Sequence, residues 1–247
     1  MVLPPSPSPS PVASSVPLRQ DCPWCGSRRL RVGRRRRGPG VRDGAGRRAP
    51  SRCRDCGHGF DDPPSAPGGG PPAGSLARAT DHARHLLAAR AVLRHQPEPE
   101  SWLDVGTGEA HFPAVARRLF PYTSFDGLDP TTRVLRARAA ERVEEGHVGT
   151  PADPHIVALL AARYDVVSLV RQLPAAPDPR AALSAALRLL RPGGHLLVDV
   201  TDRFALLPRG GTRFSACLRR ELRASGCAVL TPTGSPRVVA RRGRHTP

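Results

Sequence analysis

Two kinds of segment alternate along the chain after residue 75, and this alternation restricts the fold more than any other feature of the sequence. Short strand-like runs, typical of strands covered on both faces, lead into Gly106 and occur at 123–129, 164–170, 195–200 and 227–230. Apolar residues recur at helical spacing over 75–95, 112–119, 135–143, 183–190 and 214–222, and Arg-Pro-Gly-Gly at 191–194 is expected to end the helix before it. The pattern predicts an α/β fold with a mostly parallel sheet and helices on both faces.

A glycine loop follows the first of these strands, in the stretch WLDVGTGEAH at 102–111. Asp104 lies at the end of the strand, and Gly106 and Gly108 allow a tight turn into the next helix. Asp129 ends the second strand, where a carboxylate can accept hydrogen bonds from ribose hydroxyls. Ligands of parallel sheets bind at the carboxyl ends of the strands, so these residues predict a nucleotide-like cofactor.

The spacing of the glycines bears on which cofactor the loop holds. A dinucleotide fingerprint requires a third glycine three positions after Gly108, and His111 stands there. An acidic residue before the loop, Asp104, suits a cofactor with a positively charged amino-acid moiety, and S-adenosylmethionine is such a cofactor. The alternative is a glycine turn that binds no ligand.

Four segments, LDVGTGEA, FDGLD, YDVVSLV and ALRLLRPGGHLLVDV, resemble the ordered motifs of class I S-adenosylmethionine-dependent methyltransferases over about residues 85–231. The resemblance implies a Rossmann-like α/β sheet with S-adenosylmethionine as cofactor. It also implies that Asp104, Gly106, Thr107 and Gly108 line the methionine end of the cofactor, that Asp129 holds the ribose, and that Pro130 lies near the adenine.

The chain departs from this family in several places. Ala110 stands where many relatives have a third glycine, and Pro174 and Ala175 stand where many have a Glu-His pair. The third strand is reduced to His-Val-Gly at 147–149, and only Arg-Val-Val-Ala at 237–240 is available as the usual antiparallel last strand.

No catalytic residue can be assigned from the sequence. His111, beside the glycine loop, is the best-placed histidine to remove a proton, and His155 and His195 are weaker candidates. Each is also explained as a surface or structural residue.

Two Cys-x2-Cys pairs, each followed by glycine, precede the α/β region: Cys22 and Cys25, then Cys53 and Cys56. Four thiolates form a closed tetrahedral zinc site, so the pairs predict structural zinc in a ribbon-like module. Unrelated or redox cysteines are the alternative, and His58 could replace Cys56 as a ligand. Cys217 and Cys227 are expected to pack in the core.

The chain has a formal net charge of +17, and its basic residues are arginines, since the sequence contains no lysine. Twelve arginines lie in 28–54 and could bind phosphates, so nucleic acid is a possible partner. Trp24 and Phe60 are the only aromatic residues nearby, which disfavours a reader of single strands. The alternative is that GC-rich coding DNA produced the arginines.

The composition predicts four regions: a disordered Pro/Ser-rich tail at 1–20, the zinc-ribbon-like module at 21–60, a flexible linker at 61–74 and the methyltransferase domain at 75–247. A loose linker implies that 75–247 binds cofactor without the module. The first 20 residues do not read as a signal peptide, and no apolar run approaches the ~20 residues that span a bilayer, so a cytoplasmic protein is expected.

The favoured function is transfer of a methyl group from S-adenosylmethionine to a small-molecule or metabolite acceptor, at O, N or C. One alternative is an RNA methyltransferase that uses the basic module to bind its substrate. The Asn-Pro-Pro-aromatic motif of many amino-nitrogen base methylators is missing after 164–170. The other alternative is a binding protein that kept the fold without turnover.

Overall fold

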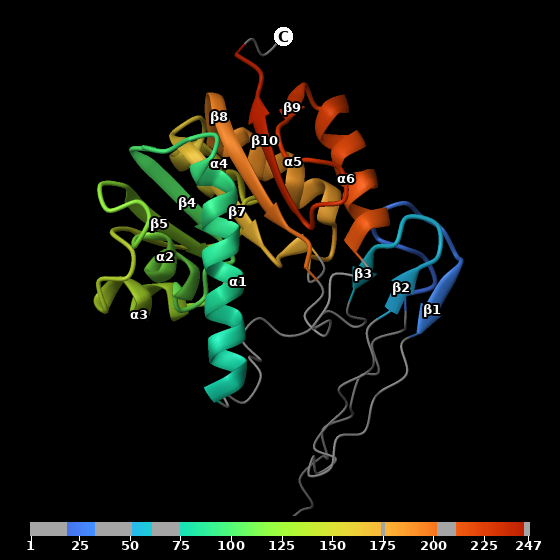
Figure 1. Cartoon of the computed structure of the whole chain (residues 1–247), viewed down its shortest axis with the longest axis horizontal. Helices are drawn as coiled ribbons and strands as arrows, with labels where there is room; N and C mark the ends of the chain where they lie inside the picture. Colours follow the sequence, from blue (N-terminus) through green and yellow to red (C-terminus); the bar gives the residue numbers. More distant parts are fainter. Residues whose placement is uncertain (1–18, 33–50, 61–74, 174–175, 202–210, 245–247) are drawn as a thin grey trace, which may run out of the picture.

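A computed structural model of the chain describes residues 19–32, 51–60, 75–173, 176–201 and 211–244 (Figure 1). Its main sheet has seven strands in the order β6-β5-β4-β7-β8-β10-β9. The strands are β4 (Ser101–Val105), β5 (Ser124–Asp129), β6 (Gly146–Val148), β7 (Tyr164–Val170), β8 (Leu190–Asp199), β9 (Cys227–Val229) and β10 (Arg237–Arg242). Strands β6, β5, β4, β7 and β8 run parallel, and β10 is antiparallel to both β8 and β9. The predicted α/β fold is confirmed.

Helices cover both faces of this sheet because successive residues of its strands point to opposite sides. The helices are α1 (Ser75–Leu93), α2 (His111–Ala116), α3 (Arg133–Ala139), α4 (Pro154–Leu160), α5 (Pro179–Leu189) and α6 (Gly211–Ala224). On one face Val166 and Leu197 pack with apolar residues of α1 and α2. On the other face Val167 and Leu196 pack with those of α4, α5 and α6. No helix in the described part of the chain is long and apolar enough to cross a membrane.

The segment Arg191–Gly194 differs from its expectation. Helix α5 ends at Leu189, and β8 begins at Leu190, so Arg-Pro-Gly-Gly lies inside the strand rather than before it. The pairing with β7 is irregular here, and a Cβ atom on Gly194 would lie 3.0 Å from the carbonyl oxygen of Tyr164. The glycine therefore allows a close approach of two backbones at a bulge.

Other boundaries shift by a few residues. Helices α2 and α3 end at Ala116 and Ala139, earlier than their apolar spacing predicts, and β6 begins at Gly146, one residue before the expected strand. Strand β10 is longer than the four residues expected and pairs with β8 over 237–241.

The cysteine-rich region forms a separate antiparallel sheet of β1 (Leu30–Val32), β2 (Ser51–Cys53) and β3 (Gly59–Phe60). This sheet and the cysteine loops beside it, residues 21–32 and 51–60, are called the cysteine module below. The module lies beside the start of α6 (Figure 1), and its buried residues belong to the same apolar core as those of α5 and α6. The expected linker, most of the expected tail and residues 33–50 of the arginine-rich region lie outside the described residues, and the domain boundaries stay predictions.

Candidate cofactor site and cysteine cluster

The strand order reverses at β4, since β5 lies on one side of β4 and β7 on the other. Loops from the carboxyl ends of the two neighbours therefore separate beside β4, which is where open α/β sheets bind ligands. The glycine loop leaves β4 at this point, and Asp129 ends β5 next to it. The structure brings together the residues that the sequence singled out for a cofactor.

The backbone of the glycine loop requires small residues. Gly106, Gly108 and Ala110 have φ of 72°, 55° and 56°, in the left-handed region that glycine adopts without steric cost. A Cβ atom on Gly106 would lie 2.0 Å from the amide carbon of Gln172, so no other residue fits there without displacing that side chain. The Gly106 and Thr107 N–H groups both donate to the carbonyl oxygen of Leu128, which ties the loop to β5.

Asp104 is buried and held by a chain of hydrogen bonds. Its Oδ1 accepts from the hydroxyl of Ser168 at 2.6 Å, and Ser168 accepts from the indole N–H of Trp102 at 2.9 Å. Burial raises the pKa of Asp104 to about 7, and the hydrogen bond from Ser168 opposes that shift. A negative charge here is therefore costly until a cation approaches.

Asp129 is fixed by the turn that follows it. Its Oδ2 accepts from the Gly108 N–H at 2.8 Å, and its Oδ1 accepts from the N–H and the hydroxyl of Thr131. A carboxylate oxygen can accept more than one hydrogen bond, so acceptor capacity remains for ligand hydroxyls. Pro130 is exposed beside Asp129, and Thr107 is buried in the loop.

Sequence reasoning missed Ser168 and Gln172. Ser168 pairs with Asp104 across β4 and β7, so only the strand register reveals its role. Gln172 follows β7, and its Nε2 donates to the carbonyl oxygen of Gly106 at 3.0 Å. Gln172 thus covers the glycine loop from the β7 side, and no local signal in the sequence indicates this contact.

The three candidate histidines lie in different places. His111 begins α2 beside the glycine loop, where its side chain is 69% exposed and its Nε2 lies 3.7 Å from Glu109. His155 is exposed at the start of α4. His195 pairs with Val166 near the start of β7 and lies beside Arg241, away from the carboxyl ends of the strands where the glycine loop lies. Only His111 adjoins the loop, and Pro174 and Ala175 lie outside the described residues.

A further histidine, His85 on α1, packs edge-on against Phe112 with ring centroids 5.8 Å apart. Burial, helped by the charge of Arg171, lowers the pKa of His85 to about 4, so the ring is neutral near pH 7. Arg171 has φ of 59° and pairs with Asp81 of α1 at 3.1 Å, which links α1 to the end of β7.

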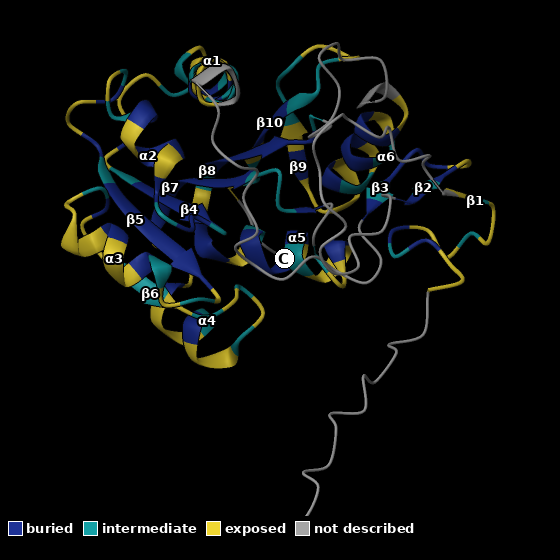
Figure 2. Cartoon of the chain, turned by 90° about the horizontal axis from the view of Figure 1, so that it is seen from below, coloured by how far each residue is buried: buried dark blue, intermediate teal, exposed yellow. Residues whose placement is uncertain are grey.

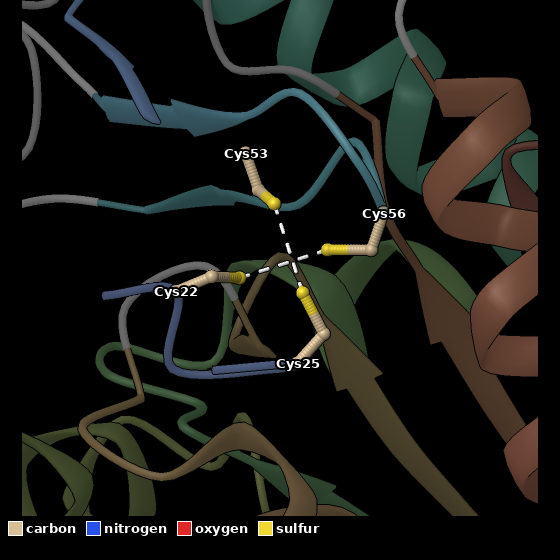
Figure 3. Close-up of side chains that lie close together, drawn as sticks. All are labelled: Cys22, Cys25, Cys53 and Cys56. Carbon is tan, nitrogen blue, oxygen red and sulfur yellow. Dashed lines mark hydrogen bonds between the residues drawn. The ribbon is translucent and has the colours of Figure 1, made fainter. Parts of the chain in front are cut away.

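The four cysteines of the two pairs converge on one point (Figure 3), with all sulfur atoms within 4.8 Å of one another. The Sγ atoms of Cys22 and Cys56 are 3.6 Å apart, and those of Cys25 and Cys53 are 3.7 Å apart. Zinc–sulfur bonds of about 2.3 Å in a tetrahedron place sulfur atoms about 3.8 Å apart, so the set fits zinc.

The surrounding backbone supports this geometry. Gly26 and Gly57 have φ of 71° and 75°, and each donates its N–H to the backbone carbonyl oxygen of the first cysteine of its pair, Cys22 or Cys53. The hydrogen bond between the two side chains lowers the pKa of Cys22 and raises the pKa of Cys56, as expected where one of two neighbouring thiols ionises first. His58 points away from the sulfur set, into aromatic rings, and its ring centroid lies 4.5 Å from that of Phe214. Cys217 and Cys227 are free thiols that pack with the core of α6 and β9, as expected.

Known proteins share this architecture. The model of a methyltransferase domain family matches residues 77–231. The chain is 36% identical to the ubiquinone biosynthesis O-methyltransferase of Cronobacter sakazakii over 106 residues. This match covers 42% of this chain and 43% of that protein. Over 102 residues it is 37% identical to the nocamycin O-methyltransferase of Saccharothrix syringae, covering 38% of this chain and 35% of that protein. The chain thus matches less than half the length of either relative.

Solved structures share the fold at low sequence identity. An O-methyltransferase family protein from Burkholderia thailandensis matches with a TM-score of 0.52 and 19% identity, covering 68% of this chain and 57% of that one. An amino pentose methyltransferase from Micromonospora echinaspora, solved with S-adenosylmethionine, matches with a TM-score of 0.50 and 17% identity, covering 70% of this chain and 99% of that one. With the glycine loop at the switch point and the family match over most of the sheet, the chain belongs to the methyltransferase domain family and has the class I S-adenosylmethionine-dependent methyltransferase fold.

Proposed function

We propose that the protein transfers a methyl group from S-adenosylmethionine to a hydroxyl group of a small organic acceptor. The observation that carries this proposal is the glycine loop between Asp104 and Asp129, placed where the strand order reverses. The two curated relatives named above are O-methyltransferases, which favours oxygen as the nucleophile.

The proposed cofactor residues divide into two groups. Asp104, Gly106, Thr107 and Gly108 would surround the methionine end, where the buried Asp104 carboxylate would face the positive charge of the cofactor. Asp129 would accept hydrogen bonds from the ribose hydroxyls, and Pro130 would lie against the adenine. Fixed hydrogen bonds to Gly108, Thr131 and Ser168 keep both carboxylates in place before the cofactor arrives.

The reaction is a displacement at carbon. When bound, the cofactor supplies an electrophilic methyl group on a sulfonium, and the acceptor oxygen forms the new bond as the carbon–sulfur bond breaks. The protein's part is to align the acceptor oxygen with that methyl group and to exclude water. A hydroxyl acceptor must also lose its proton, and His111 at the rim of the loop is the histidine placed to receive it.

The four cysteines are proposed to hold one structural zinc ion. Four thiolates complete a tetrahedron and leave no position for a substrate, so the metal would stabilise the fold rather than take part in the reaction. The ion would be the main support of a module whose own sheet has strands of only two or three residues.

Calorimetry with S-adenosylmethionine tests the proposed function. The wild-type chain should bind, and Asp129→Ala should weaken binding by about 1–3 kcal/mol because loop donors and ribose hydroxyls lose their acceptor. Asp153→Ala is a matched control, since the Oδ1 of Asp153, like that of Asp129, accepts from the N–H two residues further on, but Asp153 lies outside the site. Unchanged affinity in Asp129→Ala would remove Asp129 from the site, and a folded wild-type chain that binds no cofactor would refute the function.

A labelled methyl group then identifies the acceptor class. Transfer to a small hydroxylated compound supports the proposal, whereas transfer to RNA that high salt abolishes would favour the nucleic-acid alternative.

A further inference from the structure

Among the described residues, the cysteine module contacts the first turns of the two helices that follow β7 and β8. Trp24 is 3% exposed, and its ring meets Phe214 of α6 edge-on, with centroids 4.9 Å apart. The guanidinium of Arg180, in the first turn of α5, lies 5.5 Å from the Trp24 ring centroid. One side chain of the module therefore touches both helices at their starts.

Polar contacts reinforce the same two points. Arg213 of α6 donates to the carbonyl oxygen of Arg54 at 2.8 Å. Arg19, just before the module, donates to the carbonyl oxygen of Pro177 at 2.8 Å, between β7 and α5. Arg180 pairs with Glu221 of α6 at 3.1 Å, so the two helices are also joined to each other.

The approach of the backbones leaves no spare room. A Cβ atom on Gly57 would lie 3.0 Å from the Cβ of Arg213 and 3.2 Å from the backbone nitrogen of Phe214. His58, fully buried, stacks on Phe60 and packs at a tilt against Phe214. Such a contact is a packed interface rather than two parts joined by a linker.

The position of this interface relative to the proposed cofactor residues indicates which part of the site the module supports. The proposed cofactor residues lie at the ends of β4 and β5, whereas the module contacts the helices that follow β7 and β8. Gln172, just after β7, reaches the carbonyl oxygen of Gly106, so the proposed methionine end of the site faces the β7 side. In the proposed function, the acceptor would approach the methyl group from this side. In Figure 1 the module lies at the right of the molecule, level with the lower ends of β7 and β8, and Figure 2 shows it beside α6 from below.

We propose that the cysteine module is a fixed support of the acceptor side of the site, with Trp24 as a positioning residue that holds the starts of α5 and α6. This inference rests on the proposed function. The module thereby sets the geometry of the acceptor half and leaves the cofactor half, on β4 and β5, unchanged.

Hydrogen exchange of the full-length, metal-loaded chain tests the inference. In Trp24→Ala, exchange of peptides covering 176–182 and 211–218 should rise at least tenfold, while α4 keeps its protection. S-adenosylmethionine affinity should stay within threefold of wild type, and metal content should be unchanged. Trp24→Phe, which keeps an aromatic edge against Phe214, should restore most of the protection. Arg29→Ala is the matched control, because Arg29 pairs with Asp55 on the exposed side of the module.

Methyl transfer to catechol, used as a probe acceptor, gives a second readout. Trp24→Ala should raise the KM for catechol at least fivefold and leave the KM for the cofactor unchanged. Unaltered exchange at both helix starts, or cofactor affinity that falls together with the catechol KM effect, would overturn the inference. Failure of the wild type to bind S-adenosylmethionine would refute the proposed function instead, and the exchange result decides the inference even where catechol is not methylated.

Discussion

At the scale of single residues, the sequence identified the acidic residues but could not give their protonation state. Asp104 and Asp129 both lie at the ends of strands and are buried, and burial raises the pKa of Asp104 to about 7. Because the pKa in the folded chain lies above the value of about 4 in an unfolded one, the protonated form stabilises the fold. This contribution is complete below about pH 4 and is lost as the pH rises toward 7.

A cation beside Asp104 should favour the ionised carboxylate over the protonated carboxyl, so the affinity for the cofactor should depend on pH. If only the ionised carboxyl binds the cofactor, a pKa of about 7 makes the affinity rise about tenfold between pH 6 and pH 8. Calorimetry across this range measures the rise, and repetition in buffers of different ionisation enthalpy detects the released proton. In Asp104→Asn the dependence should disappear. A pH dependence that persists in Asp104→Asn belongs to another group and would contradict this role.

The partners that Asp104 and the glycine loop find on the β7 side could not be predicted from the sequence, for a physical reason. Ser168 and Gln172 reach the site from β7 and the residues after it, more than 60 positions away from Asp104 and Gly106. Local patterns report which residues share a strand face, but contacts between strands depend on register, which the sequence of one strand does not fix.

At the scale of elements, the strand-like runs of the sequence predicted β4, β5, β7, β8 and β9, whereas the family resemblance supplied the short segments that form β6 and β10. Helix ends were less predictable. Arg-Pro-Gly-Gly contains the residues that normally stop a helix, but Leu190 already leaves the helical conformation, and the glycines serve a bulge against β7. Helix propensity predicted that the helix ends near this segment, and packing against β7 determined the residue at which it ends.

The start of α5 has a conventional cap that can be tested. Asp178 accepts hydrogen bonds from the N–H groups of Arg180 and Ala181, and Pro179 follows it at the first helical position. Asp178→Ala should reduce the free energy of unfolding by about 0.5–2 kcal/mol, whereas Asp178→Asn, which keeps an acceptor oxygen, should cost less. Denaturant titration measures both. Equal losses in the two variants would show that charge, rather than the cap, supports the helix start.

At the scale of the whole molecule, the sequence predicted a cysteine module and a catalytic domain but not their shared core. The module has few apolar residues, and a Pro/Gly-rich connection carries no information about docking. Trp24 and Phe60 are buried together with Phe214 and Leu218 in one cluster, so the two parts share a core, and cofactor binding by 75–247 alone stays a prediction. Metal binding and the folding of α6 should therefore be linked.

Removal of the metal from the full-length chain tests this linkage. The purified protein should hold one zinc ion per chain, and a chelator should lower its melting temperature, because the module unfolds and the burial of Trp24 and Phe60 is lost. Burial of two large side chains contributes on the order of 3–6 kcal/mol, which corresponds to roughly 6–24 °C for a chain of this size. Cys53→Ser should melt as the chelated wild type does, and the 75–247 fragment should bind a hydrophobic dye through its exposed Phe214. A chelated chain or a fragment that melts at the wild-type temperature would mean that the module adds nothing to the core, and metal analysis without zinc in a folded chain would exclude the zinc site itself.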